Sequence, residues 1–277
     1  MEQKVVPVSL LMSLYIKEKK QFLQECLNSI QNQTNLPKEV LIVFDGPISK
    51  ENEILVEDFK NSYPESVKII GLEKNQGLGA ALAIGVTSCS QPIIARMDTD
   101  DIMLSNRIED EYQQFLKNPK LDIVGSNIDE FSGLMTNILG SRIVPETDEE
   151  IRNFSKRRNP FNHMTVMYKK KAVLDAGNYQ PLPGFEDYYL WVRMLKNGCK
   201  GYNIQKSLIL ARTGEDMYKR RGGIHYLVPG LKARKQIYKA GLGSLPDFVF
   251  VSLVHICISL MPNGLRGWFY EKKLRNS

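Results

Sequence analysis

The sequence PIIARMDTDD at residues 92–101 joins a short apolar run to three carboxylates that follow it directly. The run from Pro92 to Met97 predicts a buried strand. Asp98, Asp100 and Asp101 repel one another unless a positive charge lies among them. Mg²⁺ and Mn²⁺ prefer oxygen ligands, shared in such sites between carboxylates and phosphates. The stretch therefore predicts either a divalent metal site that also holds two phosphates, or a polar turn that caps the next helix.

The segments before this stretch alternate short apolar runs with amphipathic ones, which is typical of a parallel sheet covered by helices. Ligands in such sheets bind outside the carboxyl ends of the strands. The predicted strands are Val5–Leu14, Glu39–Phe44, Val67–Leu72 and Pro92–Met97, and the predicted helices are Phe22–Ile30, Ile54–Phe59 and Gly79–Val86.

After Asp101 the rhythm indicates a mixed rather than a parallel sheet, so the predicted fold class is α/β with a mainly parallel sheet flanked by helices. Extended segments are expected at Asp122–Phe131, Ile138–Val144, Met164–Tyr168 and Ser207–Arg212, and helices at Arg107–Leu116, Asp187–Lys196 and Ile224–Lys239.

Two further strand ends carry polar groups. Asp45, in Asp45-Gly46-Pro47, ends the second predicted strand, and Asn75-Gln76-Gly77-Leu78-Gly79 leads into a helix. Gly77 and Gly79 allow backbone to approach a nucleotide, or they simply form a turn. Together with Asp98 and its neighbours, these groups predict a nucleotide site at one edge of the sheet.

A second acidic pair, Glu186-Asp187, opens a predicted helix after a loop that contains Gly184. A carboxylate separate from a metal cluster can act as a general base, and Asp187 fits this function. The alternative is that the pair only stabilises the helix N-terminus.

His163, before a predicted strand, is a candidate metal ligand or diphosphate contact. Arg212 and the pair Arg220-Arg221 are candidates to neutralise phosphate.

The 277 residues, 43% of them hydrophobic, are enough for one domain with an appendage. The four cysteines lie far apart in apolar patterns and are expected to be reduced core residues.

From residue 217 onward there are eleven Lys/Arg and two acids, beside an almost wholly apolar run at Phe248–Met261. No nucleic-acid motif is present, so this region favours contact with an anionic membrane surface. A core helix or an oligomer contact is the alternative.

These motifs together resemble the family 2 glycosyltransferases of the GT-A fold, especially those of bacterial capsule, O-antigen and exopolysaccharide synthesis. The resemblance covers about residues 5 to 215. It implies that Asp187, with Glu186, supplies the catalytic base. It implies metal binding by Asp100, with Asp98 near the ribose or on the metal. The nucleotide-sugar contacts that it implies are Tyr15, Glu18, Asp45, Asn75, Gly77, Arg96 and Asp98, and His163 is a tentative third metal ligand.

The resemblance implies an inverting, Mn²⁺- or Mg²⁺-dependent enzyme that moves one hexose from a UDP-sugar, galactose or glucose, to a lipid-linked oligosaccharide. Ser13, Ile16 and Phe44 depart from the family's usual residues at their positions, and no Gln-x-x-Arg-Trp motif follows the base. The implied catalytic domain is 1–215, with nucleotide-sugar binding in 1–101 and acceptor binding in 102–215. Residues 216–277 are expected to form a basic, helical membrane-association region. The expected location is the cytoplasm, peripherally on the inner face of the cell membrane.

Two alternatives belong to other classes. A sugar-phosphate nucleotidyltransferase uses a similar sheet, but Val8 to Lys20 contains none of the glycines that its N-terminal loop requires. A scaffold that binds nucleotide sugars without turning them over has no need of Asp98, Asp100 and Asp187.

Overall fold

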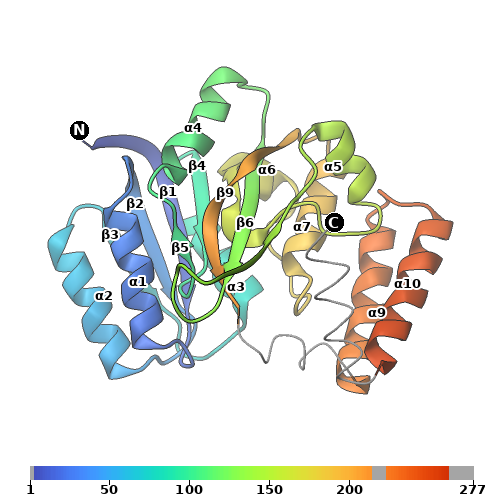
Figure 1. Ribbon diagram of the computed structural model, residues 1–277, viewed down its shortest axis with the longest axis horizontal. Helices are drawn as coiled ribbons and strands as arrows, with labels where there is room; N and C mark the ends of the chain where they lie inside the picture. Colours follow the sequence, from blue (N-terminus) through green and yellow to red (C-terminus); the bar gives the residue numbers. More distant parts are fainter. Residues whose placement is uncertain (1–2, 214–222, 262–277) are drawn as a thin grey trace.

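A nine-stranded sheet with helices on both faces forms the centre of the computed structural model, which describes residues 3–213 and 223–261 (Figure 1). The strands are β1 (Lys4–Leu14), β2 (Asn35–Phe44), β3 (Val67–Gly71), β4 (Ile93–Met97), β5 (Ile102–Met103), β6 (Ile123–Phe131), β7 (Ile138–Arg142), β8 (Met167–Lys169) and β9 (Gly201–Arg212). The helices are α1 (Lys20–Gln31), α2 (Lys50–Ser62), α3 (Leu78–Ser88), α4 (Arg107–Lys117), α5 (Asp148–Phe154), α6 (Lys170–Asp175), α7 (Glu186–Lys196), α9 (Ile224–Lys239) and α10 (Leu245–Leu260), with a 3₁₀ turn η1 (His163–Thr165).

The strand order is β3-β2-β1-β4-β8-β6-β9-β5, and β7 pairs with β6 outside this path. β1 runs parallel to both β2 and β4, and β2 runs parallel to β3. β8 is antiparallel to β4 and to β6, so the second half of the sheet is mixed. The carboxyl ends of β1, β2 and β4 therefore share one edge, and the predicted fold class is confirmed.

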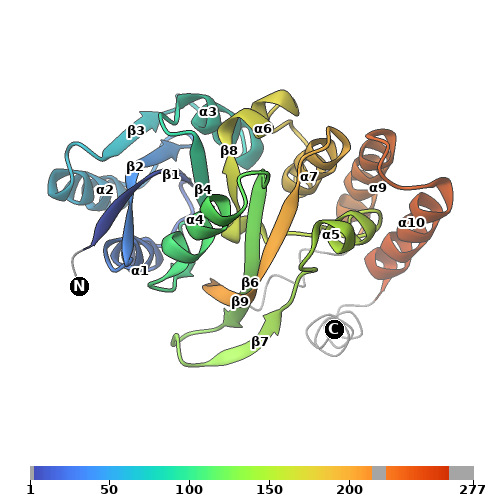
Figure 2. The same cartoon turned by 90° about the horizontal axis from the view of Figure 1, so that it is seen from above.

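Alternating side chains of β1 fill two separate cores, because successive residues of a strand point to opposite faces. Leu10 and Met12 pack with α1, α2 and α4 on one face, whereas Leu11 packs with α3, α6 and α7 on the other. Figure 2, which views the sheet from above, shows these two helical layers. The sheet is thus buried on both sides, and its carboxyl edge is left for polar groups.

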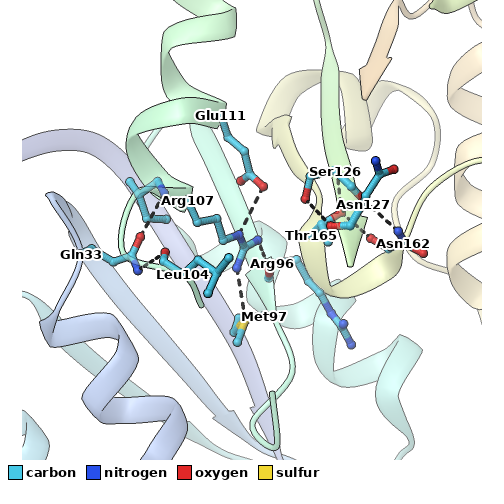
Figure 3. Close-up of polar contacts among 11 residues, drawn as sticks. Gln33, Arg96, Met97, Leu104, Arg107, Glu111, Ser126, Asn127, Asn162 and Thr165 are labelled. Atoms are coloured by element: carbon cyan, nitrogen blue, oxygen red, sulfur yellow. Dashed lines mark hydrogen bonds and ion pairs between the residues drawn. The ribbon is translucent and has the colours of Figure 1, made fainter. Parts of the chain in front are cut away.

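The predicted strand Met164–Tyr168 is partly wrong. The chain forms η1 first, and β8 begins only at Met167. Side-chain hydrogen bonds take the place of ladder bonds here. The Ser126 amide donates to Thr165 Oγ1 at 3.0 Å, and Asn162 Nδ2 donates to the Ser126 carbonyl at 2.8 Å (Figure 3). These bonds hold the turn against β6 instead of extending the strand.

Helices α9 and α10 form a hairpin beside the sheet (Figure 1). Ile237 of α9 packs with Tyr188 and Val192 of α7, which fixes the hairpin to α7. Cys26, Cys89 and Cys199 are buried as expected, but Cys257 of α10 is exposed, so the prediction of a core cysteine is wrong there. Within the described residues, no helix combines the length and the apolar character needed to cross a bilayer.

Candidate active site

Arg96 is the buried cation at the end of β4. Its side chain is 1% exposed, and its Nη1 and Nη2 donate to the two carboxylate oxygens of Asp98 at 2.6 and 2.5 Å. This two-point contact fixes the Asp98 carboxylate close to the strand end. The sequence-predicted pair Arg96 and Asp98 is therefore brought together, and Asp100 is left as the carboxylate further along the turn.

Asp100 lies among negative charges. Burial, and then the charges of Asp98 and Glu18, raise the pKa of its carboxyl to about 7. Burial raises the pKa of Glu18 as well, although Thr99 Oγ1 donates to its Oε2 at 2.5 Å. Within the described residues no Lys or Arg forms an ion pair with Asp100. The predicted residues Glu18, Asp98 and Asp100 thus meet in a site that favours a cation or a proton.

Arg212, at the end of β9, holds the backbone of this acidic turn. Its amide donates to Asp101 Oδ1 at 2.7 Å, and its Nε donates to the Asp100 carbonyl at 3.0 Å. The guanidinium also pairs with Glu25 and lies over the rings of Phe22 and Phe131. Arg212 is thus committed to supporting the turn rather than exposed as a phosphate ligand. Arg220 and Arg221 lie outside the described residues.

A buried ion pair supports the same strand end from the side of α4 (Figure 3). Arg107 Nη2 donates to the Arg96 carbonyl at 2.6 Å, and Arg107 Nε lies 3.3 Å from Glu111 Oε1. Both side chains are fully buried. Burial raises the pKa of Glu111 to about 7, against the lowering by Arg107. Sequence reasoning missed this pair, because its i,i+4 spacing also occurs on solvent-exposed helix faces.

Asp45 joins β2 to the loop before α3. Its carboxylate accepts hydrogen bonds from the Gln76 amide at 2.7 Å, the Gly77 amide at 3.0 Å and Asn75 Nδ2 at 3.0 Å. Gly77 has φ 89°, a left-handed conformation that suits glycine. The structure therefore brings the predicted residues Asp45, Asn75 and Gly77 together, and the Asp45 carboxylate shapes the loop before α3. Tyr15 lies just beyond β1 and is 42% exposed.

Glu186 and Asp187 form the first turn of α7, and Glu186 approaches the first turn of α3. A Cβ placed on Gly79 would lie 3.3 Å from Glu186 Cβ, so only glycine allows this approach without displacement. Asn159 Nδ2 donates to Asp187 Oδ2 at 2.6 Å. Burial raises the pKa of Asp187, against the lowering by the Tyr188 amide, Asn159 and the charge of Arg96. Asn159 carries no sequence signal that points to this contact.

Glu186 is the more enclosed of the two acids. Burial and the neighbouring Asp187 raise its pKa, and its Oε2 is a buried oxygen without a hydrogen-bond partner. The Asp187 carboxylate has a defined donor, and Asp187 retains partial solvent exposure. Asp187 is therefore the better placed of the two to receive a proton from a substrate.

His163, at the start of η1, lies in an aromatic cluster. Its Nε2 is 3.0 Å from Tyr179 Oη, and its ring packs against Tyr179 and Trp191. Burial, and then the charge of Arg96, lowers its pKa well below the ordinary value, which keeps the imidazole neutral. No group of three His, Cys, Asp or Glu side chains that could hold a metal occurs in the described part of the chain. The candidate metal ligands are therefore carboxylates only.

Comparisons with known proteins agree with this geometry. The profile described as "Glycosyl transferase family 2" matches residues 9–177. The chain is similar to the UDP-Gal:alpha-D-GlcNAc-diphosphoundecaprenol beta-1,3-galactosyltransferase of Escherichia coli, with 37% identity over 267 residues and 96% of each chain covered.

Solved structures of two other proteins share the fold at identities too low to show more than that. S. aureus TarS 1–349 in complex with UDP-GlcNAc has a TM-score of 0.67 and 18% identity, over 97% of this chain and 76% of that one. Another TarS structure holds a longer chain, of which this chain spans 46%. The mannosyltransferase PcManGT from Pyrobaculum calidifontis, in complex with GDP-Man and Mn²⁺, has a TM-score of 0.60 and 13% identity, over 96% of this chain and 83% of that one.

Proposed function

Because the chain belongs to glycosyl transferase family 2, we propose that it transfers one hexose from a UDP-sugar to a lipid-linked oligosaccharide, with inversion at the sugar. Galactose and glucose are the favoured sugars. One observation carries the proposal: the buried cation Arg96 bonds to Asp98 and also acts on Asp187 through its charge. A metal-side acid and a separate base candidate are thus both influenced by one buried cation. Family membership makes the chain a glycosyltransferase, which excludes the nucleotidyltransferase alternative.

The donor is proposed to lie over the carboxyl ends of β1, β2 and β4. Asp45 holds the loop of Asn75 and Gly77 beside the position of the nucleoside. Tyr15 and Glu18 follow β1 at the same edge, and the E. coli relative, named for UDP-Gal, supports a uridine nucleotide. This placement agrees with ligand binding outside the strand ends of open α/β sheets.

A divalent metal, Mn²⁺ or Mg²⁺, fits the acidic turn by the chemistry of its donors. Asp100, with Asp98 and Glu18 nearby, offers hard oxygens in a site where burial, and then the charges of Asp98 and Glu18, raise the pKa of Asp100. When bound, the ion would neutralise charge on the leaving diphosphate. No three side chains of the described residues suffice to hold an ion. The donor phosphates are therefore proposed to supply the remaining ligands of the ion beside Asp100.

Asp187 is proposed to take the proton from the acceptor hydroxyl. The hydroxyl oxygen forms a bond to the anomeric carbon, while the bond from that carbon to the diphosphate oxygen breaks and the diphosphate keeps the electron pair. Attack from the face opposite the diphosphate inverts the centre. The raised pKa of Asp187 suits a base that works near neutral pH. Asn159 fixes its orientation from the other side.

The acceptor is proposed to be a lipid-linked oligosaccharide, as in the E. coli relative whose name specifies a diphosphoundecaprenol acceptor. The enzyme would then work peripherally at the inner face of the cell membrane. A single transfer per acceptor is expected.

The test is a release assay with the purified chain, Mn²⁺, a panel of UDP-sugars and a short water-soluble GlcNAc-diphosphate acceptor. UDP release that depends on acceptor, with UDP-galactose or UDP-glucose as the best donor, supports the proposal. Asp187→Asn serves as the matched inactive variant, because it changes one atom of the proposed base. Acceptor-independent release, or full rates in that variant, would rule the proposal out.

A further inference from the structure

Helix α10 has its polarity reversed relative to a helix that packs on a soluble domain. Its side turned towards the protein carries Asp247, His255 and Ser259, which are 8%, 2% and 2% exposed. Its outward side is apolar. We call this the α10 outer face, and its residues are Leu245, Val249, Phe250, Leu253, Val254 and Leu260. A helix in contact with water on that side would normally show the opposite arrangement.

The buried polar side is bonded in place, so α10 cannot simply rotate. The Asp247 carboxylate lies 2.7 Å from Arg157 Nε, and it also accepts a hydrogen bond from the Ser244 hydroxyl at 2.6 Å. His255 Nε2 lies 3.4 Å from the Tyr226 carbonyl of α9, and the Gly223 amide donates to the Ser259 carbonyl at 2.9 Å. A Cβ on Gly230 of α9 would lie 2.0 Å from His255 Nε2, so the two helices meet at a glycine. Rotation would break these contacts and place an apolar face against them.

Positive charge borders the α10 outer face. The guanidinium of Arg157 lies 5.0 Å from the ring centroid of Phe250, and both side chains are largely exposed. Lys156 and Arg158 flank it and are exposed too. The described residues of the hairpin also carry the exposed cations Lys232, Lys235 and Lys239, against the single acid Asp247. An apolar face with a basic border complements an anionic bilayer, whereas two copies placed face to face would bring like charges together.

The hairpin also touches the segment that carries the proposed base. Phe185 directly precedes Glu186, and its ring centroid lies 6.4 Å from that of His255. Arg234 of α9 lies 5.9 Å from the same Phe185 ring. The α10 outer face is therefore one helix away from the loop where the acceptor must enter.

We propose that the α10 outer face rests in the interfacial layer of an anionic membrane, with Lys156 and Arg158 on the lipid headgroups. The helix has 16 residues, whereas about 20 are needed to span the hydrocarbon core, so it lies in the membrane plane. The inference rests on the proposed function in one respect, namely that a lipid-linked acceptor gives this docking its use. Docking brings the Asp187 side of the active site to the surface from which such an acceptor projects.

Flotation of the full chain with vesicles tests this inference. The vesicles are phosphatidylcholine alone, or phosphatidylcholine mixed with phosphatidylglycerol. The wild type should float only with the anionic vesicles. Val249→Ser with Leu253→Ser should weaken binding roughly tenfold or more, because two apolar side chains no longer enter the interface. Lys156→Glu with Arg158→Glu should weaken it similarly, and in proportion to the phosphatidylglycerol content.

Leu116→Ser is the matched control, since Leu116 of α4 is 55% exposed but lies outside the hairpin. UDP release with the water-soluble acceptor should stay at the wild-type rate in all these variants, so a failure of the proposed function would not be confused with a failure of docking. Undiminished flotation of the Val249/Leu253 variant would overturn the inference. A wild-type chain that does not float, but forms a dimer that the same variant dissociates, would overturn it in favour of a second copy.

Discussion

Arg96 and Asp98 form a two-point contact between a fully buried guanidinium and a carboxylate that lies at the edge of the candidate site. The backbone carbonyl of the same arginine accepts a hydrogen bond from Arg107. The strand end that carries the acidic turn is thus held at both the side chain and the main chain. The geometry of the turn follows from the fold and does not depend on a bound donor.

Arg96→Lys should lower kcat/KM about 30-fold, because an ammonium group cannot make both bonds to Asp98, and a charge-assisted hydrogen bond contributes about 2 kcal/mol. Initial rates of UDP release measure the effect. Arg193→Lys is the control, since the guanidinium of Arg193 likewise makes several hydrogen bonds, to the carbonyls of Tyr189, Ala176 and Asn178, but lies on α7. Equal losses in the two variants would show that the effect is only structural.

Asp100→Asn should abolish metal-stimulated activity and stabilise the metal-free protein at pH 8. The pKa of Asp100 is raised to about 7, so its destabilising charge develops as the pH rises from about 4 to 7. The variant should therefore melt several degrees above the wild type at pH 8, and at the same temperature near pH 4.

Thermal melts with and without Mn²⁺ complete this test. The metal with UDP should raise the melting temperature of the wild type and not that of the variant. Asp175→Asn is the control, because that carboxylate is exposed on α6. Equal Mn²⁺ stabilisation of wild type and Asp100→Asn would remove Asp100 from the proposed ligands.

Asn159→Ala should lower kcat about tenfold and shift the acidic limb of the pH–rate profile to higher pH. The hydrogen bond from Asn159 lowers the pKa of Asp187, so its loss raises that pKa, and the base is then deprotonated only at higher pH. A purely structural contact would change the rate without moving the limb. Binding of UDP, measured by calorimetry, should be unchanged.

Arg107→Leu should destabilise the fold by about 3–5 kcal/mol at pH 8, because Glu111 is left buried without its partner. The loss should be smaller at pH 5. Arg107 holds down the pKa of Glu111, so without it Glu111 takes up a proton more readily. Urea unfolding of the single variant and of Arg107→Leu with Glu111→Gln measures this. A loss that does not change with pH would contradict the buried-pair account.

The regular elements of the nucleotide half could be predicted because their signals are local. The consecutive apolar residues Leu10, Leu11 and Met12 predict a strand that is buried on both faces. The meeting of Asp45 with Asn75 and Gly77 also follows, since parallel strands bring their ends to one edge. The short strand β5 and the helices α5 and α6 were not predicted, because two to seven residues carry too little periodicity.

Partners of the site residues were harder to predict. Asn159 and Asp187 are 28 residues apart, and no spacing rule joins them. His163 carries a residue type suited to metals, yet packing against Tyr179 and Trp191 determines its environment. The orientation of α10 could not be predicted either, because an apolar run does not indicate which side of the helix packs against the protein. The domain boundary near residue 215 and the individual site functions stay predictions.

The anomeric configuration of the product shows directly whether transfer inverts the sugar, as proposed. In the proposed mechanism of this family 2 transferase, the base Asp187 is separate from the metal-side acids. The acceptor hydroxyl must then attack the face opposite the leaving diphosphate. NMR of the disaccharide formed from α-linked UDP-galactose, or from the preferred UDP-sugar, reads the anomeric proton coupling. The account predicts a β-linked product that Asp187→Asn fails to form, and an α-linked product would contradict it.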